Sequence, residues 1–376
     1  MLERDLATPI LRIAACPRLD CTLFSSWQVP FSAEAGTHPK SGGFDPTRLQ
    51  GLTLSPIGQS WPKPLTRRRS PRIQAPLGFG PLGFHRLKSR WARVGERIEF
   101  AAFRLVAAGI AALPLETASN LSGRCWRLVA PHLKRQRRAL DNLALAYPDM
   151  TADERRRVAS AMWDNLGRTF AEFFHIPQII AEGRIAFEPP LERFEAIAAG
   201  GPCVVCGGHL GNFELLAYSG VRLGMPFAGV YQNLSNPLVD KWLLEKRAPL
   251  YPGGLYGKST ATARALLRIA REGGYPAFFV DLRAGNGVRV PFFGRPASSL
   301  TFPAVIARTT GIPIYVGRVL RRPGVRFTIG SAPVEVPRTA DREADIRVAT
   351  ANIQARFEQF VREAPEQWMW AHRRWD

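Results

Sequence analysis

The sequence predicts an α/β fold with a central, mostly parallel sheet flanked by helices. Beyond residue 200, short apolar runs alternate with helical stretches, which is the pattern of parallel strands joined by helical crossovers. The chain has 376 residues, of which 46% are hydrophobic, enough to bury a sizeable core in one large domain or two ordinary ones. In sheets of this kind, functional residues collect at the carboxyl ends of the strands.

Residues 1–90 are predicted to be a disordered basic tail rich in proline and glycine. They contain 11 of the 31 prolines and show no sustained helical or strand periodicity. From Lys63 to Lys88 there are seven Lys or Arg residues and no acid, a pattern that is also compatible with a patch for nucleic acid or lipid headgroups. A solvated tail, or a reading frame extended too far upstream, is the simpler interpretation. The first 15 residues include Glu3, Asp5 and Arg12 in place of the apolar centre of a signal peptide.

Residues 91–140 are predicted to be a membrane-anchor or amphipathic helical segment. Its apolar run, residues 100–115, is interrupted by Arg104, closed by Pro114, and shorter than the roughly 20 apolar residues that a spanning helix needs. Basic residues flank the run on both sides, so the charge distribution indicates no orientation across a bilayer. Together with a net charge of +20, these features favour a helix bound to an anionic cytoplasmic leaflet, with a plain buried core helix as the alternative.

Residues 141–376 are predicted to form the main domain. Thr151-Ala-Asp-Glu154 is a capping box, and it opens a helix whose apolar residues recur at spacings of three and four. The apolar runs and helical stretches that follow residue 200 are 202–206, 212–223, 227–231, 237–246, 260–271, 275–280, 302–310 and 312–319.

The five cysteines are an odd number in a chain too large to need disulfides, which favours reduced thiols in a cytoplasmic compartment. Cys203, Cys206 and His209 are spaced by three, as zinc ligands can be. A strand's two-residue period, however, sends positions three apart to opposite faces, and no second Cys/His pair completes a zinc site. Core packing is therefore the preferred interpretation of both thiols, and we expect no metal or other cofactor.

His209 and Glu214 are the candidate catalytic residues. The pair follows an apolar strand and two glycines and leads into a helix, which places it at the carboxyl end of a strand. A carboxylate bonded to one ring nitrogen would fix the tautomer, leaving the other nitrogen to take a proton from an attacking hydroxyl. A structural histidine in a strand-to-helix turn is the alternative. The sequence contains neither a serine-hydrolase elbow nor a phosphate-binding loop.

Four passages resemble the lipid A biosynthesis acyltransferases, the late acyltransferases of lauroyl or myristoyl type within the glycerolipid acyltransferase superfamily. The resemblance begins near residue 91 and leaves the first 90 residues outside it. The first and last passages have no obvious catalytic reason, so their joint presence is specific to a lineage. The passages are Asn142-Leu-Ala-Leu-Ala-Tyr-Pro-Asp149, Gly208-His-Leu-Gly-Asn-Phe-Glu214, Asp281 with Gly287-Val-Arg-Val-Pro-Phe-Phe-Gly-Arg-Pro296, and Pro365-Glu-Gln-Trp-Met-Trp-Ala-His-Arg-Arg-Trp375.

The resemblance implies acyl transfer from an acyl-acyl carrier protein to a hydroxyl of a lipid A precursor, with His209 as general base oriented by Glu214. The implied partners are the acyl carrier protein, a membrane lipid substrate and the anionic cytoplasmic face of the bacterial inner membrane, and no nucleic acid is expected. One alternative is acylation of a lysophospholipid or another glycolipid by the same machinery. A non-enzymatic basic protein bound to membrane or nucleic acid is a second alternative.

The resemblance also suggests residues that bind substrate. Gln232 stands where the family often has an arginine for the acceptor's phosphate or the catalytic acid, and Arg283 could replace that cation. Asp281 matches an aspartate that the family conserves after the central strand. The alternative is a purely structural role, in which Asp281 caps the end of that strand. Leu282 follows it where similar sequences often have Gln or His, which leaves the substrate more open than the chemistry. The predicted substrate-binding residues are Asn212, Gln232, Asp281, Arg283 and Arg295.

Overall fold

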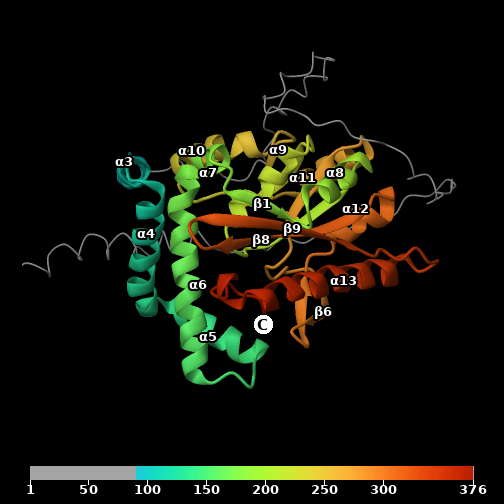
Figure 1. The fold of residues 1–376 in the computed structure, drawn as a ribbon. Coiled ribbons are helices and arrows are strands. Elements are labelled where there is room, and N and C mark those ends of the chain that lie inside the picture. The colour runs from blue at the N-terminus through green and yellow to red at the C-terminus, as the bar shows by residue number, and fades with distance from the viewer. Residues whose placement is uncertain (1–89, 376) are drawn as a thin grey trace, which may run out of the picture. The chain divides into compact units, whose positions relative to one another are not determined.

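The computed structural model describes residues 90–375, so the predictions for the preceding tail lie outside the described residues. From Val94 onward the described residues belong to one compact unit. Its helices (Figure 1) are α3 (Arg90–Ala112), α4 (Leu115–Val129), α5 (Lys134–Ala146), α6 (Ala152–Glu172), α7 (Ile176–Ala181), α8 (Leu191–Ala199), α9 (Tyr218–Arg222), α10 (Pro237–Arg247), α11 (Thr260–Arg271), α12 (Phe302–Thr310) and α13 (Arg342–Glu363).

The centre of the described chain is a seven-stranded sheet in the order β1-β9-β8-β2-β5-β3-β4. Every neighbouring pair is parallel except β8 and β9, which are antiparallel. The predicted α/β fold with a mostly parallel sheet is therefore confirmed. The strands are β1 (Ile185–Glu188), β2 (Val204–Gly207), β3 (Phe227–Tyr231), β4 (Leu255–Gly257), β5 (Tyr275–Phe279), β8 (Ile314–Arg322) and β9 (Arg326–Val334), and a separate hairpin contains β6 (Val288–Phe292) and β7 (Arg295–Ser299).

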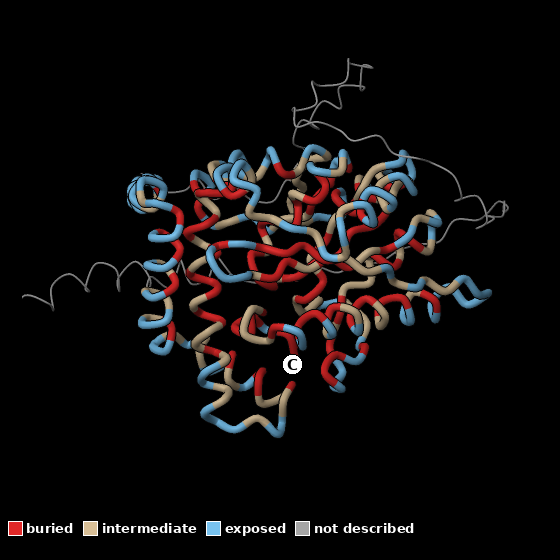
Figure 2. Tube along the Cα trace, viewed as in Figure 1, coloured by how far each residue is buried: buried red, intermediate tan, exposed pale blue. Residues whose placement is uncertain are grey.

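Helices cover both faces of the sheet, and the strands between them are buried (Figure 2). On one face, Cys206 shares a core cluster with side chains of α11, α12 and α13. On the other, Cys203 and Val205 pack with Met225 and Phe227. Residues of β2 thus alternate between the faces, as the two-residue period of a strand requires. Both thiols are buried in the core, which confirms the packing interpretation of the two cysteines.

Helix α6 begins where the capping box predicted. Thr151 donates its backbone N–H to Glu154, and the Glu154 backbone N–H donates back to the threonine hydroxyl. The inner face of the helix buries Met162 and Trp163, and the Trp163 ring stacks on Trp126 of α4. Helices α4 and α6 therefore form a packed pair beside the sheet (Figure 1).

Helix α3 contains the apolar run that was predicted to meet a membrane. Within the described chain, no helix has the length and apolar character needed to cross a bilayer. One side of α3 contacts α10, where Asn236 donates to Glu99 and Phe103 packs edge to face on Trp242. Its other side is exposed, including Leu105, so α3 is not a plain buried core helix.

Candidate active site

His209 lies in a tight turn at the carboxyl end of the central strand β2. The 3-10 helix η3 (Phe213–Ala217) follows the turn immediately. Two glycines permit this path: a Cβ at Gly208 would overlap the ring of Phe357, and Gly211 has a φ of +61°, which glycine adopts without strain. Gly208, one of the two glycines noted before His209 in the sequence, and Gly211 are therefore needed by the backbone that presents the imidazole.

The imidazole of His209 is bonded to the carboxylate of Asp281. Its Nδ1 atom lies 3.0 Å and 3.2 Å from the two carboxylate oxygens, and the backbone N–H of His209 donates to Oδ2 at 2.8 Å. The two residues are 72 positions apart in the sequence. They meet because β2 and β5 are parallel neighbours, so the segments that leave their carboxyl ends lie side by side. Asp281, predicted to bind substrate, thus lies against the candidate base.

The electrostatics of this pair define which ring nitrogen can take a proton. Burial alone would raise the pKa of Asp281, but the charge and hydrogen bonds of His209 outweigh it and hold that pKa well below its ordinary range. An ionised carboxylate accepts the proton on Nδ1, so Nε2 carries the lone pair. The His209 side chain is 15% exposed and packs edge to face against Phe213 and Phe279. The imidazole is thus held in a fixed orientation while part of it stays accessible from solvent.

Glu214 does not occupy the position predicted for it. Both of its carboxylate oxygens accept hydrogen bonds from Arg247 of α10, and the Nε–Oε2 distance is 3.0 Å. The first turn of η3 carries Glu214 toward α10, where the guanidinium matches its charge, while Asp281 already occupies Nδ1 of His209. The carboxylate that orients His209 in this structure is Asp281, and this corrects the pairing expected from the sequence.

Arg247 is a site residue that the sequence analysis missed. It provides the cation beside Glu214 that we had sought in Arg283. The only sequence signal for Arg247 was Gln232. Because Gln232 is uncharged where the family often has an arginine, a cation from another segment was expected to replace it. Gln232 itself is exposed directly after β3, and Arg283 is partly buried in the loop after Asp281.

Two other predicted substrate-binding residues make hydrogen bonds within the protein. Arg295 is exposed on β7, and its Nε donates to the carbonyl of Leu145 on α5 at 3.0 Å. Asn212 is completely buried and donates to Glu172 at 2.9 Å. Because its side chain faces α6 and not solvent, Asn212 supports the turn in this conformation.

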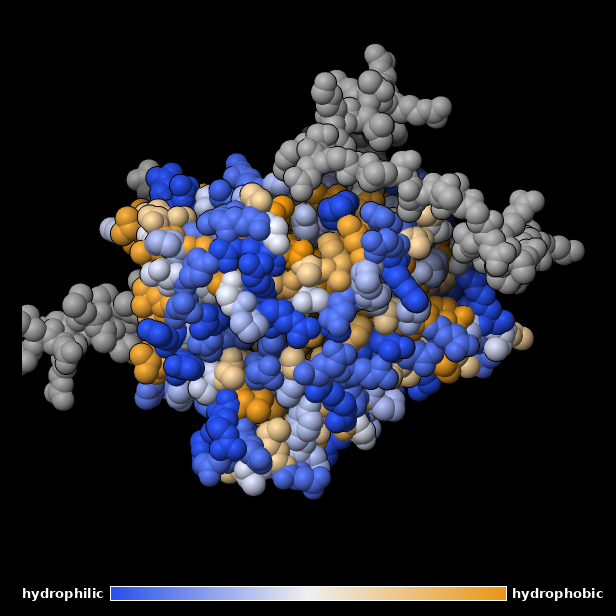
Figure 3. Space-filling model, in the orientation of Figure 1, coloured by the Kyte–Doolittle hydropathy of each residue, from blue (hydrophilic) through white to orange (hydrophobic). Residues whose placement is uncertain are grey.

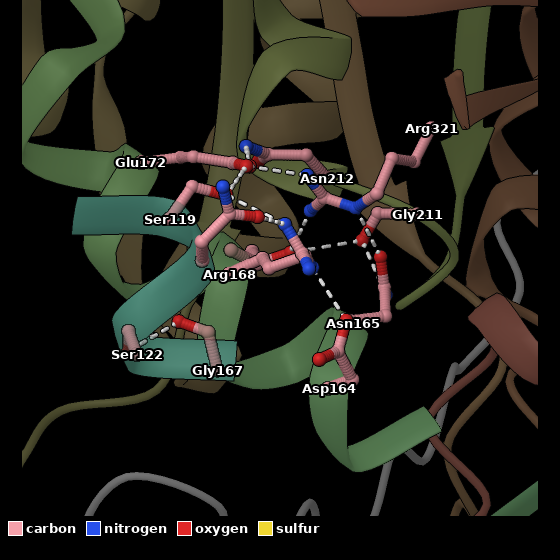
Figure 4. Close-up of polar contacts among 12 residues, drawn as sticks. Ser119, Ser122, Asp164, Asn165, Gly167, Arg168, Glu172, Gly211, Asn212 and Arg321 are labelled. Atoms are coloured by element: carbon pink, nitrogen blue, oxygen red, sulfur yellow. Dashed lines mark hydrogen bonds and ion pairs between the residues drawn. The ribbon is translucent and has the colours of Figure 1, made fainter. Parts of the chain in front are cut away.

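Asn212 belongs to a buried polar network that joins the turn to α6 (Figure 4). Glu172, at the end of α6, is fully buried and is paired with Arg321 of β8. Arg321 also donates to Asn165 at 2.8 Å, and Asn165 donates to the Gly211 carbonyl at 3.1 Å. The backbone of the turn is therefore anchored on its far side by a compensated pair of buried charges.

The carboxyl-terminal passage, which had no obvious catalytic reason, contributes two further residues. The indole Nε1 of Trp368 donates to Oδ2 of Asp281 at 2.9 Å. Nε2 of His372 lies 3.0 Å from the Asp281 carbonyl oxygen. Burial lowers the pKa of His372 to about 4, so its ring is neutral at pH 7 and donates from Nε2. The signal for both was the conspicuous ending motif, whose purpose could not be derived from composition.

A pocket opens beside the pair. It lies between α11 and the segment after β5, and Phe279 both lines it and contacts the ring of His209. Its walls are mainly apolar, but Lys258 and Arg283 bring positive charge to it. Burial lowers the pKa of Lys258 to about 8. The arrangement suits a ligand with an alkyl chain and a nearby negative charge.

The chain is similar to known proteins of lipid A biosynthesis. The family described as "Bacterial lipid A biosynthesis acyltransferase" matches residues 94–376. The chain is 24% identical over 274 residues to the "Lipid A biosynthesis acyltransferase" of Haemophilus influenzae, covering 69% of this chain and 82% of that protein. It is 25% identical over 278 residues to the "Lipid A biosynthesis lauroyltransferase" of Escherichia coli K12, covering 70% of this chain and 86% of that protein.

Proposed function

The chain belongs to the bacterial lipid A biosynthesis acyltransferases, and from this premise we propose that it transfers a fatty acyl chain from an acyl-acyl carrier protein thioester to a hydroxyl of a lipid A precursor. The observation that carries the proposal is the His209–Asp281 pair at the carboxyl edge of the sheet, beside an apolar cavity. A basic protein that only binds membranes by charge has no need of such a pair.

In the proposed reaction His209 is the general base. Its Nε2 removes the proton of the acceptor hydroxyl as the oxygen attacks the thioester carbonyl, and the buried Asp281 carboxylate stabilises the imidazolium that forms. The tetrahedral intermediate collapses, the carbon–sulfur bond breaks, and the thiolate of the carrier's prosthetic group takes the proton from His209. The products are the acylated lipid and the free thiol.

Glu214 keeps a place in this proposal through Arg247. The ion pair is largely buried, with side chains 11% and 28% exposed, and Glu214 lies on the segment that follows the turn. A guanidinium held in this way by both carboxylate oxygens has a fixed orientation. We assign the Glu214–Arg247 pair to binding of the acceptor. This is the role expected of the arginine that the family often has at the position of Gln232.

The cavity beside Phe279 is the proposed acyl-chain site. Leu266 and Phe278 give it apolar walls, and an alkyl chain that enters it leaves water for an apolar surface. The charges of Lys258 and Arg283 would then face the phosphate of the donor's prosthetic group or of the acceptor. Both substrates would thus converge on the ring of His209.

The proposed location is the cytoplasmic face of the inner membrane. Apolar side chains gather along the edge formed by α3 and α4 (Figure 3), and those that are exposed include Ile98, Leu105, Leu121 and Leu128. Arg124 and Arg127 are exposed on the same helix as the last two. An apolar face bordered by cations is typical of a surface that inserts shallowly into an anionic leaflet. The net charge of +20 also favours encounter with an acidic carrier protein.

The decisive experiment supplies the purified protein with acyl-acyl carrier protein and a lipid A precursor that still has a free acceptor hydroxyl. Mass spectrometry should show the gain of one acyl chain, and His209→Ala should remove the gain while the protein stays folded. Parallel reactions with a lysophospholipid test the alternative acceptor. Acylation of the lysophospholipid alone would overturn the lipid A assignment, and normal turnover by His209→Ala would overturn the mechanism.

A further inference from the structure

The last passage of the chain lies directly against the catalytic pair. The backbone of Gln367 accepts from the Gly211 N–H at 3.0 Å, and the Met369 N–H donates to the His209 carbonyl at 3.0 Å. Leu210 and Trp368 form an isolated antiparallel bridge between these two bonds. Residues 367–369 are therefore paired, main chain to main chain, with the turn that presents the imidazole.

Side chains of the same passage hold Asp281. The carboxylate accepts the Trp368 indole N–H on Oδ2, and the Asp281 carbonyl receives the His372 Nε2–H. Trp368 is 0% and His372 3% exposed, so neither donor has water as a competing partner. Asp281, whose carboxylate also bonds His209, is thus held at both its side chain and its backbone.

A distant helix locks this passage in place. Asn142 of α5 is buried, and its Nδ2 atom donates to the carbonyls of Trp370 at 2.8 Å and His372 at 2.9 Å. These residues are 228 and 230 positions apart from it in the sequence. Asn142 begins the first of the four family passages, and the tryptophans belong to the last. Neither passage contains a residue that takes part in the proton transfer, but in the structure the two passages are hydrogen-bonded to each other.

From these contacts we propose that residues 367–372 form a positioning strap, in which Trp368 and His372 fix Asp281, the main chain fixes the His209 turn, and Asn142 latches the strap to α5. The inference rests on the proposed function for its kinetic consequences. Trp368 and His372 are positioning residues, since they act on the substrate only through the His209–Asp281 pair. The strap explains why the ending of the chain and a segment of α5 are parts of the same site.

The first test is Trp368→Phe, which removes the N–H and keeps an aromatic ring. We expect kcat to fall about 10- to 100-fold, with little change in KM for either substrate, because the base is misplaced and not the binding surface. Without the indole donor, the Asp281 carboxylate keeps more negative charge beside Nδ1 of His209. The His209–Asp281 pair should therefore lose its proton at a pH about one unit higher. The acid limb of the pH–rate profile should move upward accordingly.

The matched control is Trp163→Phe. Trp163 is equally buried and loses an equivalent bond, since its Nε1 donates to Gln136 at 2.6 Å, but it lies on α6 away from the pair. This variant should keep the wild-type pH profile even if its melting temperature falls. Identical kcat and identical pH profiles for Trp368→Phe and Trp163→Phe would overturn the proposal.

Rescue and latch variants separate positioning from folding. His372→Gln keeps an N–H near the Asp281 carbonyl and should retain activity, whereas His372→Phe should lose kcat as Trp368→Phe does. Asn142→Leu touches neither member of the pair and should reproduce the shifted pH profile by loosening the strap. Equal activity of the two His372 variants, or an unchanged profile in Asn142→Leu, would count against the strap.

A second readout is independent of the acyl transfer. In protein with ¹⁵N-labelled histidine, the ring signals of His209 report the titration of the pair by NMR. Trp368→Phe should move that titration to higher pH and Trp163→Phe should not. If the wild-type protein acylates none of the offered acceptors but this shift appears, the proposed function fails and the strap stands. If the protein is active and the titration does not move, the strap fails alone.

Discussion

Asp281 is the residue on which the proposed proton transfer depends most directly after His209. We predict that Asp281→Asn lowers kcat by about 10²- to 10⁴-fold, because the neutral amide neither stabilises an imidazolium nor holds Nδ1–H as a carboxylate does. Steady-state kinetics with the acyl carrier substrate measure the effect.

The control for Asp281→Asn is a buried aspartate elsewhere. Asp345 is 2% exposed and bonded to Arg308 at 2.6 Å, so Asp345→Asn also removes a buried carboxylate charge. It should lower the melting temperature and keep the wild-type kcat. If Asp281→Asn stayed within tenfold of wild type, the pairing seen here would not be the catalytic one.

Lys258 predicts a pH dependence of substrate binding. Burial disfavours its charged form, so the positive charge is present below about pH 8 and is lost as the pH rises through that value. If this charge faces a phosphate, KM for the substrate concerned should rise up to about tenfold for each pH unit above 8. Lys258→Arg, whose guanidinium stays charged, should flatten the rise. Coincident KM profiles for the two proteins between pH 7 and 9.5 would contradict this role.

At the scale of elements, α6 is tied to β8 by the buried pair of Glu172 and Arg321. Arg321→Met should cost about 3–5 kcal/mol of unfolding free energy, because it leaves the fully buried Glu172 carboxylate without compensation. The neighbouring Arg322 pairs with the exposed Glu188, and Arg322→Met should cost less than about 1 kcal/mol. Urea unfolding of both variants measures the difference, and equal midpoints would show that the network does not stabilise the fold.

Helix α11 forms one wall of the proposed acyl site, so its side chains should set chain length. Ala263 lines the cavity, and Ala263→Phe should shift preference toward shorter acyl chains by filling part of its volume. Ala261 is exposed on the same helix, and Ala261→Phe should leave the preference unchanged. Competition among dodecanoyl, tetradecanoyl and hexadecanoyl carriers gives the ratio. An unaltered ratio in Ala263→Phe would move the acyl chain to another site.

At the scale of the whole molecule, the exposed face of α3 and α4 predicts how the protein is held at a membrane. Leu105→Glu should weaken binding to vesicles containing anionic lipid, since it places a charge in the apolar face, whereas Val348→Glu on α13 replaces an exposed apolar residue elsewhere and should not. Flotation assays compare the two variants at matched lipid concentration.

The same face predicts a response to salt and alkali. Each basic residue near an anionic surface contributes about 1 kcal/mol, and salt screens this attraction over roughly 8–10 Å. High salt should therefore weaken membrane binding, and carbonate should release the protein. Retention until detergent is added would indicate a spanning segment, and recovery in the soluble fraction without treatment would remove the expected location of the lipid substrate.

Local rules in the sequence were sufficient for much of the fold. The capping box at Thr151 and the stretches 227–231, 260–271 and 302–310 coincide with elements of the structure, because capping, periodicity and turn chemistry act over a few neighbouring residues. The hairpin of β6 and β7, the strand β9 and the helix α13 were not assigned. The hairpin and β9 do not follow the alternation of strands and helices. Helix α13 does have a start signal, since Asp341 caps it and Glu343 and Asp345 lie in its first turn, but the sequence analysis did not use that signal.

The sequence by itself determined that a histidine stands in a glycine turn at the end of a buried strand, since that depends on local backbone freedom and apolar periodicity alone. Only the tertiary structure decided which groups meet it. Glu214, five residues after the histidine, bonds to Arg247. Asp281 bonds to His209, which is 72 positions away, and Trp368 bonds to Asp281, which is 87 positions away. Strand order and the path of the chain's last residues place these side chains together, and neither is encoded in the spacing of a motif.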